Sequence, residues 1–228
     1  VGFEALMRWP HPHRGMVAPD VFIPLAEQSE LIVELDTFAL REASDVAATW
    51  GRSSPDVEPP FVTVNLSARQ LHDVNLVQKV REVLAASHLT PDRLIIEITE
   101  RAAMVNIDDT MTVLNRLRHL GVRMALDDFG TGYSSLSYLT MLRPEIIKID
   151  RSFVATHPEH DGVALLETIV SLGHRLEITM LAEGIETEDQ MEHLRELGCQ
   201  LGQGFLFAQA VSATQVSSLL LQPTTNLR

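Results

Sequence analysis

The stretch Val122–Leu136, VRMALDDFGTGYSSL, decides the fold of this chain and also points to its site. A largely apolar run from Val122 to Leu126 ends at two adjacent carboxylates, Asp127 and Asp128, and a loop with two glycines follows. This order is typical of a buried strand that leads into a functional loop. Neighbouring carboxylates repel each other in a partly dry site, so one must bind a proton or a cation must lie between them.

Outward from this stretch, strand-like and helix-like segments alternate along the chain. The expected strands are residues 1–9, 61–66, 94–99, 122–126, 145–149, 178–182 and 200–207. The expected helices are residues 20–30, 31–50, 76–87, 107–120, 136–142, 163–175, 188–197 and 212–221. Such alternation predicts a parallel sheet covered by helices.

The predicted fold class is therefore α/β, a TIM-like (β/α)8 barrel. Seven strands almost close an eight-stranded barrel, so we expect the missing first strand upstream of Val1 and interpret the chain as an N-terminally truncated piece of a longer protein. We expect residues 1–228 to form a single domain.

Polar groups recur at the carboxyl ends of the expected strands, which is where TIM barrels build their sites. These groups are Glu4, Asn65, Glu97, Asp127, Asp128, Lys148, Glu183 and Gln203. A single acid after a strand is usually a helix cap or a member of a surface ion pair. Most of these strand ends carry such a group, however, and this favours one shared site.

The charges of this set indicate metal ions. Glu4, Glu97, Asp127, Asp128 and Glu183 would bring five negative charges together, which is strongly destabilising without cations. Two divalent ions and one lysine would balance them. Carboxylate and amide oxygens suit Mg²⁺ or Mn²⁺ better than zinc. Paired ions of this kind support metal-assisted phosphodiester hydrolysis, which is our hypothesis for the reaction.

Composition excludes some partners. The chain has 18 basic and 31 acidic residues and a formal net charge of −13, which argues against non-specific binding to nucleic acid polymers or anionic membranes. The single cysteine, Cys199, excludes an internal disulfide and fits a reducing compartment. We therefore expect a cytoplasmic location, although segments outside this chain could anchor the parent protein to a membrane.

At these residues the chain resembles the EAL-domain family of cyclic di-GMP phosphodiesterases. The stretch FEALMRW contains the name motif Glu4-Ala5-Leu6. The further matching stretches are HPHRGMVAPDVFIPLAEQ, VNLSARQL, IEITE, ALDDFGTGYSSL, IIKIDRSFV, LAEGIET and QGFLF. The resemblance implies a TIM-like barrel that hydrolyses cyclic di-GMP to the linear dinucleotide pGpG.

The resemblance also implies roles for individual residues. The implied metal ligands are Glu4, Asn65, Glu97, Asp127, Asp128 and Glu183. Asp127 would bridge two ions, Mg²⁺ or Mn²⁺, with Asp128 and Glu183 close to the second. Glu183 is the implied general base and Lys148 the lysine that contacts the attacking water, with Asp128 counted beside them as catalytic.

Other implied roles concern the substrate and partners. The implied contacts to cyclic di-GMP are Leu6, Arg8, Asp150, Glu186 and Gln203. Glu100 would anchor the loop of residues 129–136, and this loop with its following helix would form a homodimer contact. Sensory or GGDEF domains are expected upstream in the parent protein.

The chain departs from the family pattern in three places. The strand with a Tyr-Gln-Pro stretch that normally precedes the first motif is absent. Phe205, Gln209 and Ala210 replace usual family residues near the last strand, and Met7 replaces a more usual aliphatic residue.

The alternative function is a degenerate EAL domain that binds cyclic di-GMP without cutting it. Such receptors usually lack several ligands or the lysine, whereas every implied position is filled here, which favours the enzyme.

Overall fold

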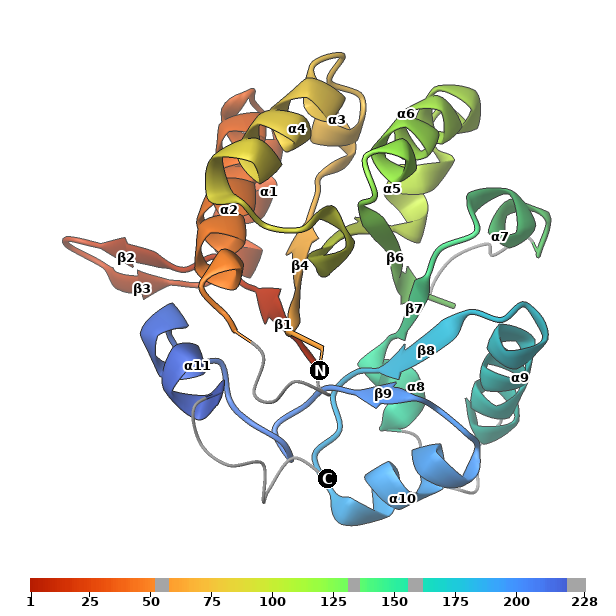
Figure 1. Cartoon of the computed structure of the whole chain (residues 1–228). Helices are drawn as coiled ribbons and strands as arrows, with labels where there is room; N and C mark the ends of the chain where they lie inside the picture. Colours follow the sequence, from red (N-terminus) through yellow and green to blue (C-terminus); the bar gives the residue numbers. More distant parts are fainter. Residues whose placement is uncertain (52–57, 131–135, 156–161, 221–228) are drawn as a thin grey trace. The chain divides into compact units, whose positions relative to one another are not determined.

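The computed structural model describes residues 1–51, 58–130, 136–155 and 162–220 (Figure 1). These residues form two compact units. Among the described residues, the first unit contains residues 1–98, 102–123 and 213–220, and the second contains residues 99–101 and 124–212. Each unit is described by itself below. That residues 1–228 form a single domain stays a prediction.

The first unit is built on parallel strands in chain order. These strands are β1 (Gly2–Ala5), β4 (Phe61–Asn65) and β5 (Leu94–Thr99), the last residue of which belongs to the second unit. In their register, Glu4 pairs with Thr63, and Asn65 pairs with Glu97. β5 is buried over five of its six residues because it is rich in isoleucine and leucine.

Helices pack against these strands. The helices and the 3₁₀ turn of this unit are α1 (Pro19–Glu27), α2 (Leu31–Ala48), α3 (Ala68–Leu71), α4 (Leu76–Ser87), η1 (Pro91–Arg93), α6 (Ile107–His119) and α11 (Ala213–Leu220). α2 lies against β4, α1, α3 and α4. Its buried residues recur every three or four positions, which is the period of one helix face: Ile32, Asp36, Leu40, Ala43, Ser44 and Ala47.

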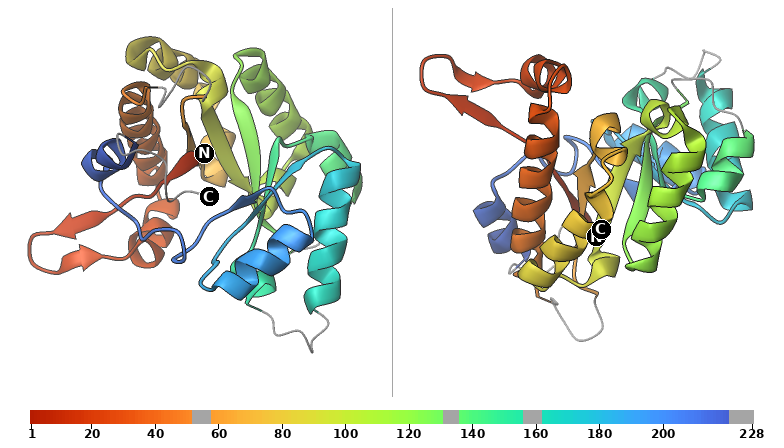
Figure 2. Two further views of the ribbon diagram at one scale, coloured as in Figure 1. Left: turned by 60° about the horizontal axis from the view of Figure 1, so that its bottom comes forward. Right: turned by 90° about the horizontal axis from the view of Figure 1, so that it is seen from above.

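A short antiparallel ribbon follows the first strand. It consists of β2 (Trp9–His11) and β3 (Gly15–Val17). In their register, Trp9 pairs with Val17. In both views of Figure 2 the ribbon extends away from α1 and α2. Trp9 still contacts α1, because its ring meets that of Phe22 edge-on at a centroid distance of 5.8 Å.

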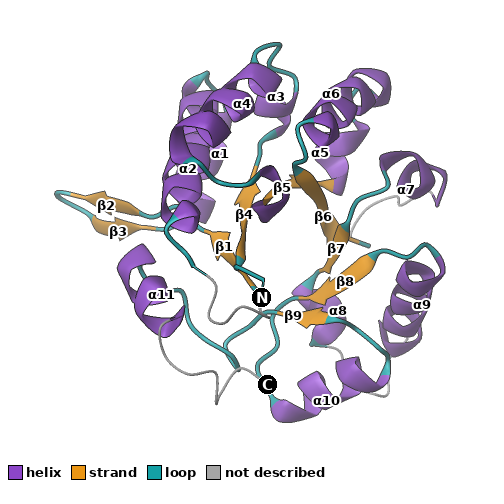
Figure 3. Cartoon of the chain, in the orientation of Figure 1, coloured by secondary structure: helices purple, strands orange, loops and turns teal. Residues whose placement is uncertain are grey.

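The second unit repeats the parallel arrangement. Its strands are β6 (Arg123–Phe129, whose first residue belongs to the first unit), β7 (Ile146–Ile149), β8 (Thr179–Ala182) and β9 (Leu201–Gly202), each paired in parallel with the next (Figure 3). All four residues of β7 are buried, Lys148 among them.

The helices of the second unit connect these strands. They are α7 (Leu136–Leu142), α8 (Arg151–Val154), α9 (Gly162–Arg175) and α10 (Glu188–Glu196), while α5 (Glu100–Met104) contains residues of both units. α9 contacts α8 and β8, and Leu166, Ile169 and Val170 are its buried apolar residues. Burial of this face in the core stabilises the helix by about 25 cal/mol per Å² of apolar surface.

The expected alternation of strands and helices is present in each unit, with differences at the ends of elements. The helix expected from Asp20 begins one residue earlier, with Pro19 in its first turn and no side-chain cap. The stretch between the first expected strand, residues 1–9, and this helix contains β3. The last expected strand, residues 200–207, shortens to Leu201–Gly202 because the chain turns at Gly204. Phe205 beyond this turn is 71% exposed.

Within the described residues, none of the helices has the length and apolar character required to cross a bilayer.

Candidate functional site

The first unit brings Glu4, Asn65 and Glu97 onto three adjacent strands. Asn65 ends β4 and its Nδ2 donates a hydrogen bond to Glu4 Oε1 on β1 at 3.0 Å. On the opposite side of β4 from β1, Asn65 pairs in register with Glu97 of β5. Glu97 is 1% exposed. Three of the expected oxygen ligands therefore belong to one set of neighbouring strands.

The second unit carries Asp127 and Asp128 on a β-bulge. Three steps along β6, from Leu126 to Phe129, match two steps along β7, from Ile147 to Ile149. A bulge of this kind bends the strand and re-aims its side chains. Asp128 takes up the extra residue with φ of +55°, a left-handed conformation that aspartate tolerates better than most residues.

Lys148 is the centre of the charged groups in the second unit. Its side chain on β7 is 2% exposed, and its Nζ lies 2.8 Å from Glu183 Oε1 and 3.3 Å from Asp127 Oδ1. Lys148 is therefore a buried cation between Glu183, the expected general base, and Asp127, an expected metal ligand, rather than the exposed lysine that a single lysine in a sequence usually is. A buried lysine requires such partners because the isolated charge is costly in an apolar interior.

Asp128 has the electrostatic setting of a group that resists ionisation. Burial raises the pKa of its carboxyl, and the negative charges of Asp127 and Asp150 raise it further, whereas Lys148 lowers it. The backbone N–H of Asp128 donates to Asp127 Oδ1 at 3.0 Å, which fixes the first carboxylate of the pair. The repulsion expected from adjacent acids is thus present in the structure.

The loop after β8 holds Glu183 in place through its backbone. The Glu183 N–H donates to the carbonyl of Ile149 at 3.1 Å. Gly184 has φ of +71°, and a Cβ atom there would lie 2.5 Å from Cβ of Arg151. Gln190 closes the loop from α10, because its Oε1 accepts the N–H groups of Glu186 at 2.8 Å and Thr187 at 3.1 Å.

The remaining expected site residues lie in varied surroundings. Leu6 is 45% exposed, and Arg8 is exposed with its Nη1 bonded to the carbonyl of Met7. Glu186 is exposed, and the backbone N–H of Gln203 donates to the carbonyl of Ala182 at 2.8 Å. The structure thus leaves their contacts to a substrate as predictions.

Asp150 and Glu100 occupy the starts of short helices. Asp150 caps α8, where Ser152 N–H donates to its Oδ1 at 3.0 Å. Burial opposes ionisation of Asp150, but the hydrogen bonds from Ser152 and Arg151 and the positive charge of Arg151 together outweigh it and lower its pKa. Glu100 begins α5 and is 6% exposed. The loop that it was expected to anchor includes residues 131–135, which lie outside the described residues.

The donor chemistry of the expected metal ligands fits Mg²⁺ or Mn²⁺, because every one of them offers a carboxylate or amide oxygen. Glu4, Asn65 and Glu97 belong to the first unit, whereas Asp127, Asp128 and Glu183 belong to the second. Across the described ranges, no group of three or more His, Cys, Asp or Glu side chains could hold a metal ion. The complete ligand set therefore stays a prediction.

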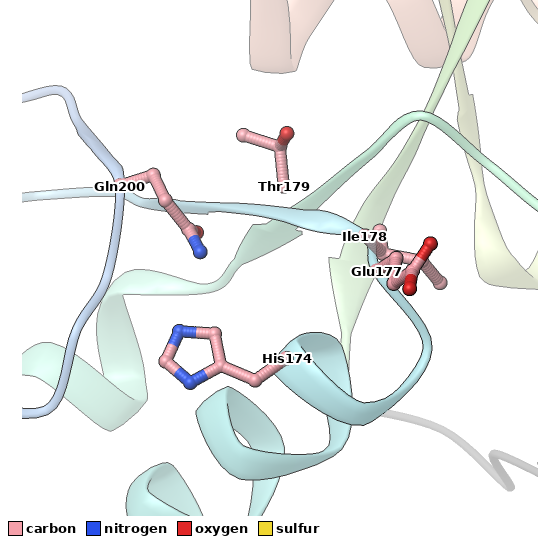
Figure 4. Close-up of a pocket in the computed structure, with 5 residues that line it drawn as sticks. All are labelled: His174, Glu177, Ile178, Thr179 and Gln200. Carbon is pink, nitrogen blue, oxygen red and sulfur yellow. The ribbon is translucent and has the colours of Figure 1, made fainter.

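A pocket of the second unit lies at the other ends of its strands. It is lined by His174, Glu177, Ile178, Thr179 and Gln200, and the side chains of His174 and Gln200 face each other across it (Figure 4). Thr179 begins β8 and Gln200 precedes β9, so this pocket is at their amino ends. Glu183 and Gln203 follow the carboxyl ends, and the pocket is distinct from the site they would form.

A protein-family model described as the EAL domain matches residues 1–210. The chain belongs to the EAL-domain family. The bifunctional diguanylate cyclase/cyclic di-GMP phosphodiesterase MucR of Pseudomonas aeruginosa is 42% identical to this EAL chain over 221 residues, which cover 95% of the chain and 31% of MucR. The chain thus spans about a third of the length of this curated relative.

Solved EAL structures confirm the fold. A PaMucR phosphodiesterase structure, a cyclic di-GMP complex, matches with a TM-score of 0.88 and 42% identity over 93% of this chain and 86% of that one. A manganese and cyclic di-GMP complex of Klebsiella pneumoniae BlrP1 matches with a TM-score of 0.76 and 32% identity over 90% of this chain and 50% of that one. The expected fold class, a TIM-like α/β barrel, is confirmed by this likeness.

Two residues that contact the site loops were not predicted from sequence. Gln190 could have been found from the pattern Thr187-x-x-Gln190, a capping box that the structure confirms at the start of α10. Asp36 is the second, and its signal is an acid in the middle of the apolar stripe of α2, between Ile32 and Leu40.

Proposed function

We propose that this EAL domain hydrolyses cyclic di-GMP to linear pGpG with the help of two bound Mg²⁺ or Mn²⁺ ions. The observation that carries the proposal is the buried Lys148, whose ammonium lies 2.8 Å from Glu183 and 3.3 Å from Asp127. Buried charged groups of this kind cluster at catalytic sites. The names of MucR and its solved phosphodiesterase support the same substrate.

The chain's own residues would divide the work as follows. Lys148 holds the carboxylates of Glu183 and Asp127 in fixed orientations and offsets part of their negative charge. Glu183 would accept a proton from the attacking water as general base, with its loop held by Gly184 and Gln190. The water oxygen would bond to phosphorus, and the bond from phosphorus to a ribose 3′ oxygen would break. That oxygen would take up a proton to become the free 3′ hydroxyl of pGpG.

Metal ligands in this proposal are the oxygen groups at the strand ends. They are Glu4, Asn65, Glu97, Asp127, Asp128 and Glu183. When bound, the ions would lower the pKa of the attacking water and neutralise charge on the phosphate. The net charge of −13 makes such neutralisation necessary for an anionic dinucleotide to approach.

The proposal extends to partners and location. Leu6, Arg8, Asp150, Glu186 and Gln203 would contact the substrate. The loop after Asp128 together with α7 would form a homodimer contact, upstream sensory or GGDEF domains would control the parent protein, and the reaction would take place in the cytoplasm.

The test is turnover with a matched variant. We would incubate the chain, and the parent protein, with cyclic di-GMP and Mn²⁺ or Mg²⁺ and measure pGpG by chromatography. Glu183→Gln keeps the shape of the side chain but removes the base, so we expect turnover to fall roughly 10²–10⁴-fold with cyclic di-GMP still bound. Glu192→Gln, on the exposed face of α10, is the control and should act as wild type. Tight binding with no product from the wild-type protein would instead support a receptor.

A further inference from the structure

The two backbone N–H groups that follow Asn65 are both held by defined acceptors. Leu66 N–H donates to the carbonyl of Glu97 at 2.9 Å, and Ser67 N–H donates to Oδ2 of Asp36 at 3.0 Å. The first bond ties the end of β4 to β5. The second ties it to α2, an element that carries none of the expected site residues.

Asp36 occupies a position where a carboxylate is costly. It is 3% exposed and lies between Ile32 and Leu40 on the buried face of α2. Burial raises the pKa of Asp36 to about 6, the Ser67 side chain and backbone lower it by hydrogen bonding, and the negative charge of Glu27 on α1 raises it again. An apolar residue would satisfy the packing of this helix face without that cost.

The contacts of Asp36 converge on one turn. Ser67 is the N-cap of α3, and its Oγ accepts the N–H of Gln70 at 3.1 Å. Asp36 therefore orients both the hydroxyl and the N–H of Ser67, the residue two positions after Asn65. A neighbouring bond from Gln70 Nε2 to Thr37 Oγ1, at 3.3 Å, joins α3 to α2 without touching this turn.

The side-chain amide of Asn65 has a defined orientation. Its Nδ2 donates to Glu4 Oε1, so its amide is already committed to a partner on β1. The direction of a side chain at the last residue of a strand depends on where the following backbone goes. That backbone is fixed at Leu66 and Ser67.

We propose that Asp36 is a positioning residue, which holds the turn after Asn65 so that the Asn65 amide stays beside Glu4 in the geometry required of a metal ligand. This inference rests on the proposed function, in which Asn65 binds a divalent ion. Hydrogen-bonded partners behind a ligand typically change metal affinity by 10–100-fold when they are removed.

The experiment measures Mn²⁺ binding in the absence of substrate, by electron paramagnetic resonance of free Mn²⁺. Asp36→Leu keeps the branching of the side chain at Cγ and removes the acceptor, and we expect about 10–100-fold weaker Mn²⁺ binding. Asp36→Asn keeps an oxygen for Ser67 N–H and should remain within about threefold of wild type. Thr37→Val removes the bond from α2 to Gln70, together with the bond that Thr37 Oγ1 donates to the carbonyl of Val33 within α2, and its Mn²⁺ affinity should equal that of wild type.

Turnover gives a second readout. At saturating Mn²⁺ we expect the KM for cyclic di-GMP of Asp36→Leu to stay within about threefold of wild type, while the Mn²⁺ concentration for half-maximal turnover rises as the affinity falls. Asp36→Ala, which leaves room for a water molecule, carries the comparison if Asp36→Leu does not fold, as judged by circular dichroism.

Three results would overturn the proposal. Wild-type Mn²⁺ affinity in the folded Asp36→Leu or Asp36→Ala protein would refute the positioning role and leave the proposed function intact. An equal loss in Thr37→Val would show a general packing defect. A wild-type protein that binds no Mn²⁺ would refute the proposed function itself, and the ligand role of Asn65 with it.

Discussion

At the scale of single residues, the decisive fact is that Lys148 is buried with two carboxylates against it. Asp127 and Glu183 keep 14% and 21% of their side-chain surface, so solvent still reaches them, whereas Lys148 keeps 2%. An ammonium in this position is a fixed positive charge between acids on β6 and after β8. It reduces their mutual repulsion whether or not a metal ion is bound.

Lys148→Met tests this fixed charge. The substitution leaves Asp127 and Glu183 without their common partner, and breaking a buried pair typically costs about 3–5 kcal/mol. Because both acids reach solvent, we expect a smaller loss of roughly 2–3 kcal/mol in the free energy of unfolding measured with urea in EDTA. Turnover should fall roughly 10²–10⁴-fold.

The matched control is Lys79→Met. Lys79 pairs with Asp73 at 2.7 Å, but its side chain is 29% exposed. Pairs near the surface that solvent reaches contribute about 0–1 kcal/mol, so this variant should lose little stability and no turnover. Equal losses of stability in the two variants would contradict the role given to burial.

Asp36 predicts a pH dependence of stability. Its folded-state pKa of about 6 lies above the ordinary value of 3.8. The folded protein therefore holds this proton more tightly than the unfolded chain does, and the stability gained in this way is present at low pH and lost as the pH rises to about 6. Asp36→Asn cannot ionise. Its free energy of unfolding relative to wild type should therefore grow by roughly 1–2 kcal/mol between pH 5 and pH 8.

Asp73 provides a control of opposite sign. Burial opposes its ionisation, but hydrogen bonds and charge from Lys79 and a bond from Asn75 N–H outweigh burial and lower its pKa. The stability that it contributes is present above its ordinary pKa and lost as the pH falls. Asp73→Asn should therefore become less stable relative to wild type as the pH rises, by urea unfolding. The same trend in both variants would contradict the assignment.

Sequence could predict the acids at the strand ends but not every group that holds them. The end of a strand can be recognised in the sequence where an apolar run is followed by polar residues, as at Asp127. The bulge at Asp128 has no such signal, because it depends on the register between β6 and β7. Asp36 is remote in sequence from Ser67, and their contact depends on the packing of α2 against α3.

At the scale of elements, the loops that carry site residues are held in place by helices that contain none of the expected site residues. α10 supplies Gln190 to the loop after Glu183, and α2 supplies Asp36 to the turn after Asn65. In each case one side chain bonds backbone N–H groups next to a site residue. The packing of these two helices therefore affects where the Glu183 carboxylate and the Asn65 amide lie.

Gly184→Ala tests the loop after Glu183. The residue has φ of +71°, and the new Cβ would lie 2.5 Å from Cβ of Arg151, so the loop must shift. We expect a loss of roughly 2–4 kcal/mol in the free energy of unfolding and a fall in kcat, because Glu183 is the preceding residue.

Gly15→Ala separates the two causes of this loss. Gly15 has φ of +69°, but no atom lies within 4 Å of a Cβ built there. Gly15→Ala should therefore lose only about 1 kcal/mol of the free energy of unfolding, from backbone strain, and leave kcat unchanged. If Gly184→Ala behaved as Gly15→Ala does, the contact with Arg151 would not position the loop.

Elements with a clear hydrophobic pattern could be predicted from sequence, whereas the shortest helices could not. The bounds Leu76–Ser87, Leu94–Thr99 and Leu136–Leu142 agree with the structure because each has a continuous periodic pattern. The four-residue helices α3 and α8 are too short to show a period. The shortened β9 has a different reason, since Gly204 packs against the backbone of Ile185 and the chain turns there.

At the scale of the whole molecule, net charge connects stability to metal binding. The formal charge of −13 includes acids at strand ends of both units, and a large excess of like charge opposes folding. Bound cations would relieve this repulsion in the folded protein and have no equivalent set of ligands in the unfolded chain. Metal binding should therefore raise stability as well as permit turnover.

Melting temperature in three solutions measures this coupling. A ligand at 100 times its Kd stabilises a protein by about 2.7 kcal/mol, which for a chain of this size corresponds to roughly 5–10 °C. We expect Mn²⁺ to raise the melting temperature of the chain by this amount over EDTA, and EDTA to stop turnover. Ca²⁺ should also raise the melting temperature but support little turnover, because its looser coordination does not impose the required geometry. Full turnover in EDTA, or a melting temperature unchanged by saturating Mn²⁺, would refute the metal-dependent mechanism, whereas stabilisation by Mn²⁺ without pGpG would leave a metal-binding receptor in its place.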